Sequence, residues 1–271
     1  MKFAVLICNF NHADFIEETI LSVLRVNEID TIFFTDDGSS DESVQKVENL
    51  AEKFTRLRIL RDDWGNIGYA NRVSRYSSVL NDYDFALILD SDDRLIPTGI
   101  TLGLRRLQKE KLDTLFGATA LINQAGEPTG VIDGINTPQM PFPSELYSCC
   151  FADRSLKSCN ANFNSLLHQN WVRTTSNILF KTTCIEDLFP IPSVRANPDW
   201  FIALKLASRG NSFYTAIPFA EHRIHSSNLT SDNLEDSKVE AGIVFEEILG
   251  QVDISDLPHA RLAVESNLYL R

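Results

Sequence analysis

Three carboxylates that follow a short apolar run are the residues of this chain best suited to chemistry. Asp90, Asp92 and Asp93 come almost directly after the apolar residues 85–89. An apolar run of this length is typical of a buried strand in a parallel sheet, and ligands bind at the carboxyl ends of such strands. Clustered carboxylates repel one another unless a cation lies among them, and oxygen ligands favour Mg²⁺ or Mn²⁺. Taken alone, these residues predict either a metal site or a solvated acidic turn.

Two further predicted strands, the all-apolar residues 3–8 and residues 29–35, are also followed by polar residues. The polar residues are, in chain order, Asn9, Asn11, Asp36 and Asp37, with the aromatic Phe10 between the first two. Parallel strands end at the same edge of their sheet, so three such strand ends form one crevice. This convergence is stronger evidence for a binding site than any single motif.

The order of the predicted elements indicates an α/β fold with a doubly wound, mostly parallel sheet. No Gly-x-Gly-x-x-Gly follows the first strand, so the fingerprint of a dinucleotide-binding domain is lacking. Residues 133–165 are rich in Pro, Ser, Asn and Cys and predict a mobile loop with some helix. Strands are expected at 3–8, 29–35, 57–60, 85–89, 114–122, 171–180 and 213–216. Helices are expected at about 15–26 (capped by Asp14), 42–54, 98–110, 185–188, 197–208 and 257–269. Two more are expected, one that runs from the loop at 62–72 to about residue 80 and one that begins at about residue 235.

Composition restricts the partners and the compartment. With 25 basic and 37 acidic residues the net charge is −12, which argues against nucleic-acid binding. Cys8 is expected in the core, whereas Cys149, Cys150 and Cys159 are either a metal or redox cluster or, as we favour, reduced thiols. Neither a signal peptide nor a membrane span is recognisable, which predicts a cytoplasmic protein. Peripheral association with the cytoplasmic face of the membrane stays open.

The second half of the chain contributes two further polar candidates. Asp199 lies in the first turn of the helix expected at 197–208, where a carboxylate also suits the helix dipole. His225 lies in the polar stretch 221–228, which we expect to be an exposed loop. Taken in isolation, Asp199 needs no role beyond the helix dipole, and His225 needs no role beyond that of a loop residue.

The ordered set of motifs resembles the family 2 glycosyltransferases, which are inverting enzymes of the GT-A fold. The similarity spans about residues 3–230 and is most specific up to Pro97. It implies a GT-A domain at 1–230, with a nucleotide-binding half at 1–97 and an acceptor-binding half at 98–230, and a C-terminal helical extension at 231–271. The matching stretches are Cys8-Asn9-Phe10-Asn11, Asp36-Asp37-Gly38-Ser39, 66–71, Leu89-Asp90-Ser91-Asp92-Asp93, 175–180, 190–192, Pro198-Asp199-Trp200 and 223–228.

The resemblance also implies roles for individual residues. Phe10 would stack on the nucleotide base and Asp37, beside Asp36, would accept a hydrogen bond from the base. Asp92 and His225 would bind the metal, and Asp90 would contact the ribose or the metal. Asp199 would be the general base, although Pro198 stands where the family often has an acidic residue. The remaining residues expected near the nucleotide, diphosphate or sugar are Asn9, Asn11, Asn66, Asn71, Arg72 and Ser91.

The activity that the resemblance implies is transfer of a sugar from a nucleotide-diphosphate sugar, with UDP the commonest nucleotide in the family. Mn²⁺ or Mg²⁺ is the implied cofactor, and a glycan or lipid-linked acceptor would place the reaction in cell-surface polysaccharide or glycoconjugate synthesis. The alternatives are a nucleotidyltransferase and an inactive sugar-nucleotide-binding protein of an assembly complex. A nucleotidyltransferase would usually carry a Gly-rich, basic loop after the first strand, which residues 9–12 lack. A phosphatase would place its Asp-x-Asp after the first strand, not after the fourth.

Overall fold

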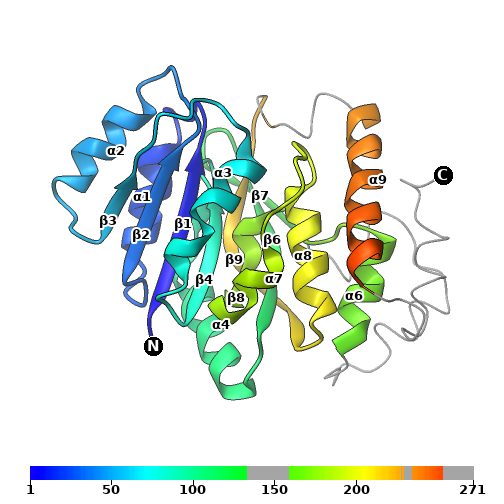
Figure 1. Cartoon of the computed structure of the whole chain (residues 1–271). Helices are drawn as coiled ribbons and strands as arrows, with labels where there is room; N and C mark the ends of the chain where they lie inside the picture. Colours follow the sequence, from blue (N-terminus) through cyan, green and yellow to red (C-terminus); the bar gives the residue numbers. More distant parts are fainter. Residues whose placement is uncertain (133–158, 227, 229–233, 253–271) are drawn as a thin grey trace.

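The computed structural model of the chain describes residues 1–132, 159–226, 228 and 234–252. Within this part of the chain, one nine-stranded sheet runs through the molecule in the order β3-β2-β1-β4-β8-β6-β9-β5, with β7 paired to β6 (Figure 1). The expected α/β architecture with a largely parallel sheet and a helical C-terminal part is therefore confirmed.

The first half of the sheet is the parallel half that the apolar runs predict. Strands β1 (Phe3–Asn9), β2 (Thr31–Asp36), β3 (Leu57–Leu60) and β4 (Phe85–Asp90) pair in parallel. Strands β1, β2 and β4 are buried over almost their whole length, as expected for strands covered on both faces. Their connections include the helices α1 (Ile16–Leu24), α2 (Ser43–Ala51) and α3 (Tyr69–Tyr76) and the 3-10 turn η1 (Ser77–Leu80).

The second half of the sheet mixes parallel and antiparallel pairs. Strand β6 (Thr114–Asn123) runs parallel to β9 (Ser212–Ile224) and antiparallel to β8 (Ile178–Lys181) and β7 (Pro128–Ile132). The two-residue strand β5 (Arg94–Leu95) pairs antiparallel with the end of β9. Residues 91–93 alone join β4 to β5, although β8, β6 and β9 lie between these two strands in the sheet order. The sheet therefore curls, and the end of β9 comes close to the end of β4.

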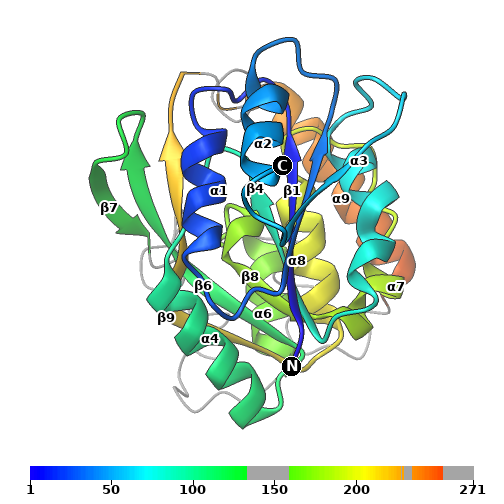
Figure 2. The same ribbon diagram turned by 90° about the vertical axis from the view of Figure 1, so that its left-hand side faces the viewer.

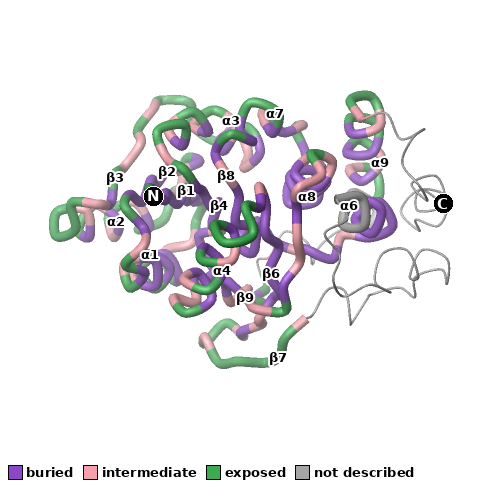
Figure 3. The backbone as a smooth tube through the Cα atoms, turned by 90° about the horizontal axis from the view of Figure 1, so that it is seen from below, coloured by how far each residue is buried: buried purple, intermediate pink, exposed green. Residues whose placement is uncertain are grey.

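Helices cover both faces of the sheet (Figures 1 and 2). Helices α1, α2 and α4 (Pro97–Glu110) pack on the face that carries Phe3, Val5 and Ile7 of β1. The opposite face packs on α3 and on a second group of helices. This group consists of α6 (Cys159–His168), α7 (Ile185–Leu188), α8 (Pro198–Ser208) and α9 (Leu234–Gln251). Figure 3 shows the central strands β1 and β4 buried, whereas β7 at the rim is largely exposed.

The structure corrects three expectations about single elements. Residues 171–177 are not part of a strand, because the 3-10 turn η2 (Thr175–Asn177) precedes β8. The strand expected at 213–216 extends to Ile224, since its polar end pairs with β5 and β6. Asp14 does not cap α1; Phe15 holds the cap position without a side-chain hydrogen bond.

Several expectations fall on parts of the chain that the structure does not describe. These are residues 133–158 of the loop expected at 133–165, the second C-terminal helix at 257–269, and the side chains of Cys149, Cys150 and Cys159. Cys8 is 5% exposed and lies in the core as predicted. Among the described helices, none has the length and apolar character needed to cross a membrane.

Candidate active site

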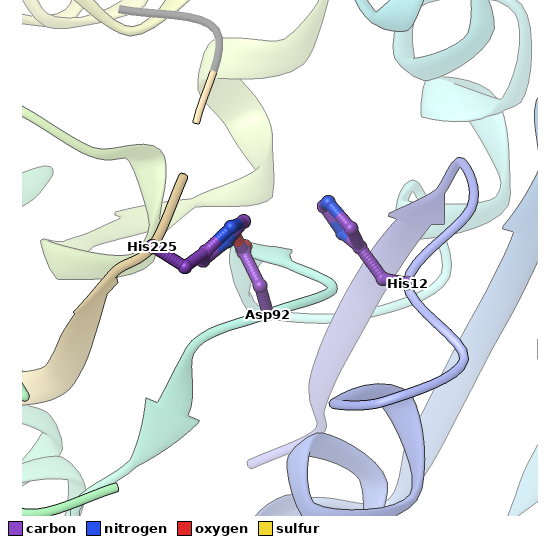
Figure 4. Close-up of side chains that lie close together, drawn as sticks. All are labelled: His12, Asp92 and His225. Atoms are coloured by element: carbon purple, nitrogen blue, oxygen red, sulfur yellow. The ribbon is translucent and has the colours of Figure 1, made fainter. Parts of the chain in front are cut away.

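Three side chains from distant parts of the chain meet beside the end of β4. Asp92 lies between β4 and β5, His225 directly follows β9, and His12 lies on the loop after β1 (Figure 4). His225 Nε2 is 2.8 Å from Asp92 Oδ2, and both side chains are almost completely buried. One ligand atom from each of the three residues lies within 4.8 Å of the other two. Two imidazoles and a carboxylate so close together are a donor set that fits a divalent metal ion.

His12 is the member of this group that the sequence motifs did not single out. Its Nδ1 lies 2.7 Å from Ser91 Oγ, and its ring is edge-on to the His225 ring with centroids 5.7 Å apart. The available signal was its position directly after Asn11, at the same sheet edge as the predicted metal ligands.

Asp90 and Asp92 have opposite electrostatic environments although they are two residues apart. Burial, reinforced by the neighbouring charges of Asp93 and Asp92, raises the pKa of Asp90 to about 7. Burial also acts to raise the pKa of Asp92, but the hydrogen bond with His225 and the nearby imidazoles hold that pKa below its usual value. The two Asp90 oxygens accept hydrogen bonds from the Thr174 and Thr175 hydroxyls, at 2.8 and 3.2 Å.

Asp93 is completely buried and ties three segments together. It accepts hydrogen bonds from Ser176 Oγ at 2.7 Å and from the backbone N–H of Arg223 at 3.0 Å, and lies 3.1 Å from His222 Nδ1. Burial acts to lower the pKa of His222, but the charge of Asp93 outweighs it and raises this pKa to about 9. No motif had assigned a role to Asp93 or His222.

The acidic pair after β2 holds the neighbouring loops in place. Asp36 accepts hydrogen bonds from the backbone N–H of Ser39 at 2.7 Å and from Asn9 Nδ2 at 2.8 Å. Asp37 accepts from the backbone N–H groups of residues 67 and 68 and from Arg72 Nε, at 2.9, 2.8 and 3.1 Å. Asn9 and Arg72 are buried, with 0% and 1% of their surface exposed. Asp36 and Asp37 are thus surrounded by protein contacts, and their expected contacts with a nucleotide stay predictions.

Other predicted nucleotide-binding residues lie on the surface of the same edge. Phe10 is 44% exposed, and Asn11, Asn66 and Asn71 are exposed as well. Asn11 has a left-handed backbone (φ 54°) and accepts a hydrogen bond from the N–H of Ser40 at 2.8 Å. Exposed aromatic and amide groups beside the strand ends are available to a ligand from solvent.

Asp199 lies in the first turn of α8, as the sequence predicted, and is 9% exposed. Asn170 Nδ2 donates a hydrogen bond to its Oδ2 at 2.8 Å. Burial raises the pKa of Asp199 above its ordinary value in spite of this hydrogen bond. A buried carboxylate with a raised pKa is a stronger base than an exposed one.

A pocket of about 320 Å³ lies next to the three-residue group. Its lining includes His12 and His225 together with residues of the loop after β1. The group is therefore accessible to a small ligand although Asp92 and His225 are buried.

Comparisons with known proteins give one family and one fold. The sequence model described as Glycosyl transferase family 2 matches residues 4–189. An uncharacterized glycosyltransferase of Mycoplasma genitalium is 27% identical over 124 residues, which cover 43% of this chain and 40% of the relative. The chain thus matches about two fifths of that relative's length.

Solved structures of S. aureus TarS share the fold. Residues 1–349 of TarS in complex with UDP-GlcNAc are 16% identical, with a TM-score of 0.69 over 98% of this chain and 71% of that chain. The complex of the same fragment with UDP is also 16% identical, with a TM-score of 0.62 over 98% and 70% of the two chains. At this identity the likeness concerns the fold.

Proposed function

The chain belongs to glycosyl transferase family 2, and we propose that it transfers a sugar from a nucleotide-diphosphate sugar to an acceptor hydroxyl with inversion at the anomeric carbon. Membership confirms the predicted resemblance and the enzyme class, and it favours a glycosyltransferase over the nucleotidyltransferase alternative. The observation that carries the proposal is the 2.8 Å contact between Asp92 and His225, which are 133 positions apart in the chain. Both had been expected to hold the metal ion.

Asp92 and His225 would hold the metal ion. Mn²⁺ or Mg²⁺ at this position would offset the charge that develops on the diphosphate leaving group. Asp90, whose carboxylate accepts hydrogen bonds from the Thr174 and Thr175 hydroxyls, would contact the ribose. Among the described residues, the group close enough to share one ion does not include Asp90.

Asp199 is the general base that removes the proton from the acceptor hydroxyl. Its raised pKa increases its basicity, and the hydrogen bond from Asn170 holds one oxygen in position. A base on the side of the sugar away from the diphosphate gives inversion in a single displacement. The contribution of Asp199 thus differs from that of Asp92, which acts on the leaving group.

A UDP-sugar is the donor that we propose. The TarS fragment that shares the fold was solved with UDP-GlcNAc, and the exposed Phe10 offers a face on which a base can stack. Residues 1–97 form the nucleotide-binding half, and 98–230 the half that binds a glycan or lipid-linked acceptor. A lipid-linked acceptor would bring the enzyme to the cytoplasmic face of the membrane, in cell-surface polysaccharide synthesis.

The test is calorimetric titration of the purified chain with UDP, dTDP, GDP and CDP, each with and without Mn²⁺. We expect UDP to bind, and to bind more tightly with the ion. Failure of all four nucleotides to bind would contradict the proposal. Tighter binding of another nucleotide would keep the enzyme class and replace the donor.

Two substitutions distinguish the metal-binding role proposed for Asp92 from the role of general base proposed for Asp199. Asp92→Asn should abolish the metal-dependent part of UDP binding, because a neutral amide is a poor ligand for the ion. Asp199→Asn should leave UDP binding unchanged and remove sugar transfer. Normal transfer by the second variant would show that another group is the base.

A further inference from the structure

We propose that His12 is a third protein ligand of the metal ion, and that the resulting set of two imidazoles and one carboxylate selects Mn²⁺ over Mg²⁺. The inference rests on the proposed function, because the ion is the one assigned there to Asp92 and His225. It goes beyond that function by adding a ligand that the sequence motifs do not identify and by choosing between the two ions.

The distances in the group suit a single ion. The 2.8 Å between His225 Nε2 and Asp92 Oδ2 is close to the spacing of about 3 Å between adjacent ligands of an octahedral ion with bonds of about 2.1 Å. All three ligand atoms lie within 4.8 Å of one another, a limit little above the spacing of about 4.2 Å between opposite ligands of such an ion. A small movement of the half-buried His12 ring is enough to close the site.

His12 is held in this place by the acidic turn itself. Its Nδ1 lies 2.7 Å from the hydroxyl of Ser91, the residue directly before Asp92. The ring also contacts Phe15 edge-on, with centroids 6.1 Å apart. Polar contacts that orient the ring are typical of metal-binding histidines.

The other two carboxylates of the acidic turn are engaged elsewhere. Both oxygens of Asp90 accept hydrogen bonds from threonine hydroxyls. Both oxygens of the fully buried Asp93 are held, by the N–H of Arg223 and His222 on one side and by Ser176 on the other. Asp92 is thus the carboxylate of the turn that remains for the ion.

This donor set determines the preference between ions. Mg²⁺ prefers oxygen ligands in near-ideal octahedral geometry and gives up its water reluctantly. Imidazole nitrogen binds transition-metal ions better, and a site of two histidines and one carboxylate with open positions is typical of such ions. Three protein ligands leave positions for water and for diphosphate oxygens. The adjacent pocket of about 320 Å³, lined by both histidines, gives the ion access.

The experiment measures metal binding by the full chain without donor or acceptor. Mn²⁺ is titrated into metal-free protein and free Mn²⁺ is followed by electron paramagnetic resonance; Mg²⁺ is then added as competitor. We expect Mn²⁺ to bind at least about tenfold more tightly than Mg²⁺, and His12→Gln to weaken Mn²⁺ binding by about 10–100-fold. The effect of His12→Gln on Mg²⁺ binding should be smaller.

Nitrogen couplings to the bound Mn²⁺ supply a second readout, which needs no variant. The unsubstituted chain should show two coordinated imidazoles, and His12→Gln one. His222→Gln is the matched control, because the His222 ring faces Asp93 and not the ion; it should retain two. The glutamine at position 12 can still hydrogen-bond Ser91, so a purely structural role of His12 would leave the metal affinity unchanged.

Three results would overturn the inference: a single coordinated imidazole in the unsubstituted chain, equal Mn²⁺ affinity in His12→Gln, or tighter binding of Mg²⁺. None of them removes the proposed function, because Asp92 and His225 still provide a metal site. Conversely, a chain that binds Mn²⁺ through two imidazoles but fails to bind any of the four nucleotides would leave the inference intact and contradict the proposed function.

Discussion

Neighbouring carboxylates in this site have different surroundings, and we propose different functions for them. Asp92 lies against His225 and stays ionised, whereas burial and two acidic neighbours raise the pKa of Asp90 to about 7. Asp93, with 0% exposure, joins the end of β4 to β9 through the N–H of Arg223. One acidic turn therefore supplies a metal ligand in our proposal, a titrating group and a structural anchor.

Asp199→Asn should stabilise the fold at neutral pH while it removes transfer. Burial raises the pKa of Asp199 in the folded state, so the folded chain binds the proton more tightly than the unfolded chain. The free energy of unfolding then falls as pH rises from about 3.9, the ordinary pKa of Asp, through the raised pKa. The stability advantage of the variant should be largest above this range and vanish below it. Urea unfolding of the variant and the unsubstituted chain, at pH 7.5 and at the lowest pH that keeps the chain folded, measures this advantage. A stability difference that does not change with pH would contradict this account.

Arg72→Met should destabilise the fold rather than act through the nucleotide alone. The guanidinium is 1% exposed and pairs with Asp37 at 3.1 Å and with Asp62 at 2.7 Å. Removing one partner leaves the Asp37 carboxylate buried without its cation, which costs about 3–5 kcal/mol in comparable pairs. Urea unfolding monitored by circular dichroism gives the loss.

Arg75→Met is the control for this prediction. Arg75 lies 3.7 Å from the same Asp62 carboxylate but is 42% exposed, so its removal should change stability by at most about 1 kcal/mol. Equal stability of the two variants, with a loss of UDP affinity in Arg72→Met alone, would assign Arg72 to the ligand instead.

At the scale of elements, close packing of α4 on β9 helps to position the site. Helix α4 follows β5 and passes so close to β9 that a Cβ atom on Gly99 would lie 2.1 Å from the carbonyl oxygen of Pro218. Because β9 leads to Arg223 and His225, this approach of helix and strand influences where His225, a proposed metal ligand, lies. A glycine in a helix usually lowers stability, and at position 99 it is needed for packing.

Alanine should therefore have opposite effects at two helical glycines. Gly99→Ala forces α4 away from the β9 backbone and should cost about 1–3 kcal/mol. Gly242→Ala, in α9, meets nothing within 4 Å and should stabilise the chain by up to about 1 kcal/mol through helix propensity. Thermal or urea unfolding of both variants measures the two signs. Stabilisation by Gly99→Ala would show that α4 and β9 do not pack this closely.

At the scale of the whole molecule, the C-terminal part expected as a helical extension shares the main core. Helix α9 packs on α8, with Phe245 against Trp200 at a centroid distance of 5.2 Å. Ala241, Val244 and Ile248 of α9 belong to the same buried cluster as α8 and one face of the sheet. The boundary near residue 230 is thus one between elements of a common core, and Trp200 connects α9 to the proposed base next to it.

Phe245→Ala should accordingly destabilise the whole chain and not α9 alone. The side chain is 2% exposed, and truncation of a buried Phe to Ala costs about 3–5 kcal/mol. Near-ultraviolet circular dichroism, which reports on packed aromatic side chains including Trp200, and far-ultraviolet circular dichroism should give one coincident transition at lower urea concentration. Val239→Ala, at a position that is 67% exposed, should change the free energy of unfolding by no more than about 0.5 kcal/mol. Two separate transitions would mean that α9 folds as an independent unit.

The sequence by itself was sufficient for the local and parallel part of the fold. The strands expected at 57–60 and 85–89 agree with β3 and β4 within one residue, because apolar runs bounded by polar turns require no distant information. Of the strand predicted at 171–180, only residues 178–180 lie in a strand, since η2 turns residues 175–177 toward the acidic turn, where Thr175 and Ser176 contact Asp90 and Asp93. Tertiary hydrogen bonds outweighed strand propensity there.

Residue types and their order determined the family, the acidic turn and the candidates Asp92, Asp199 and His225. Only the tertiary structure decided which of these side chains meet. The antiparallel pairing of β5 with β9 curls the sheet and brings His225 to Asp92 across 133 positions, and the loop after β1 adds His12. The tertiary structure also decided that Asp90 and Asp93 accept hydrogen bonds from other parts of the chain. Long-range pairing and the satisfaction of buried polar groups depend on the whole chain, so no local pattern could supply them.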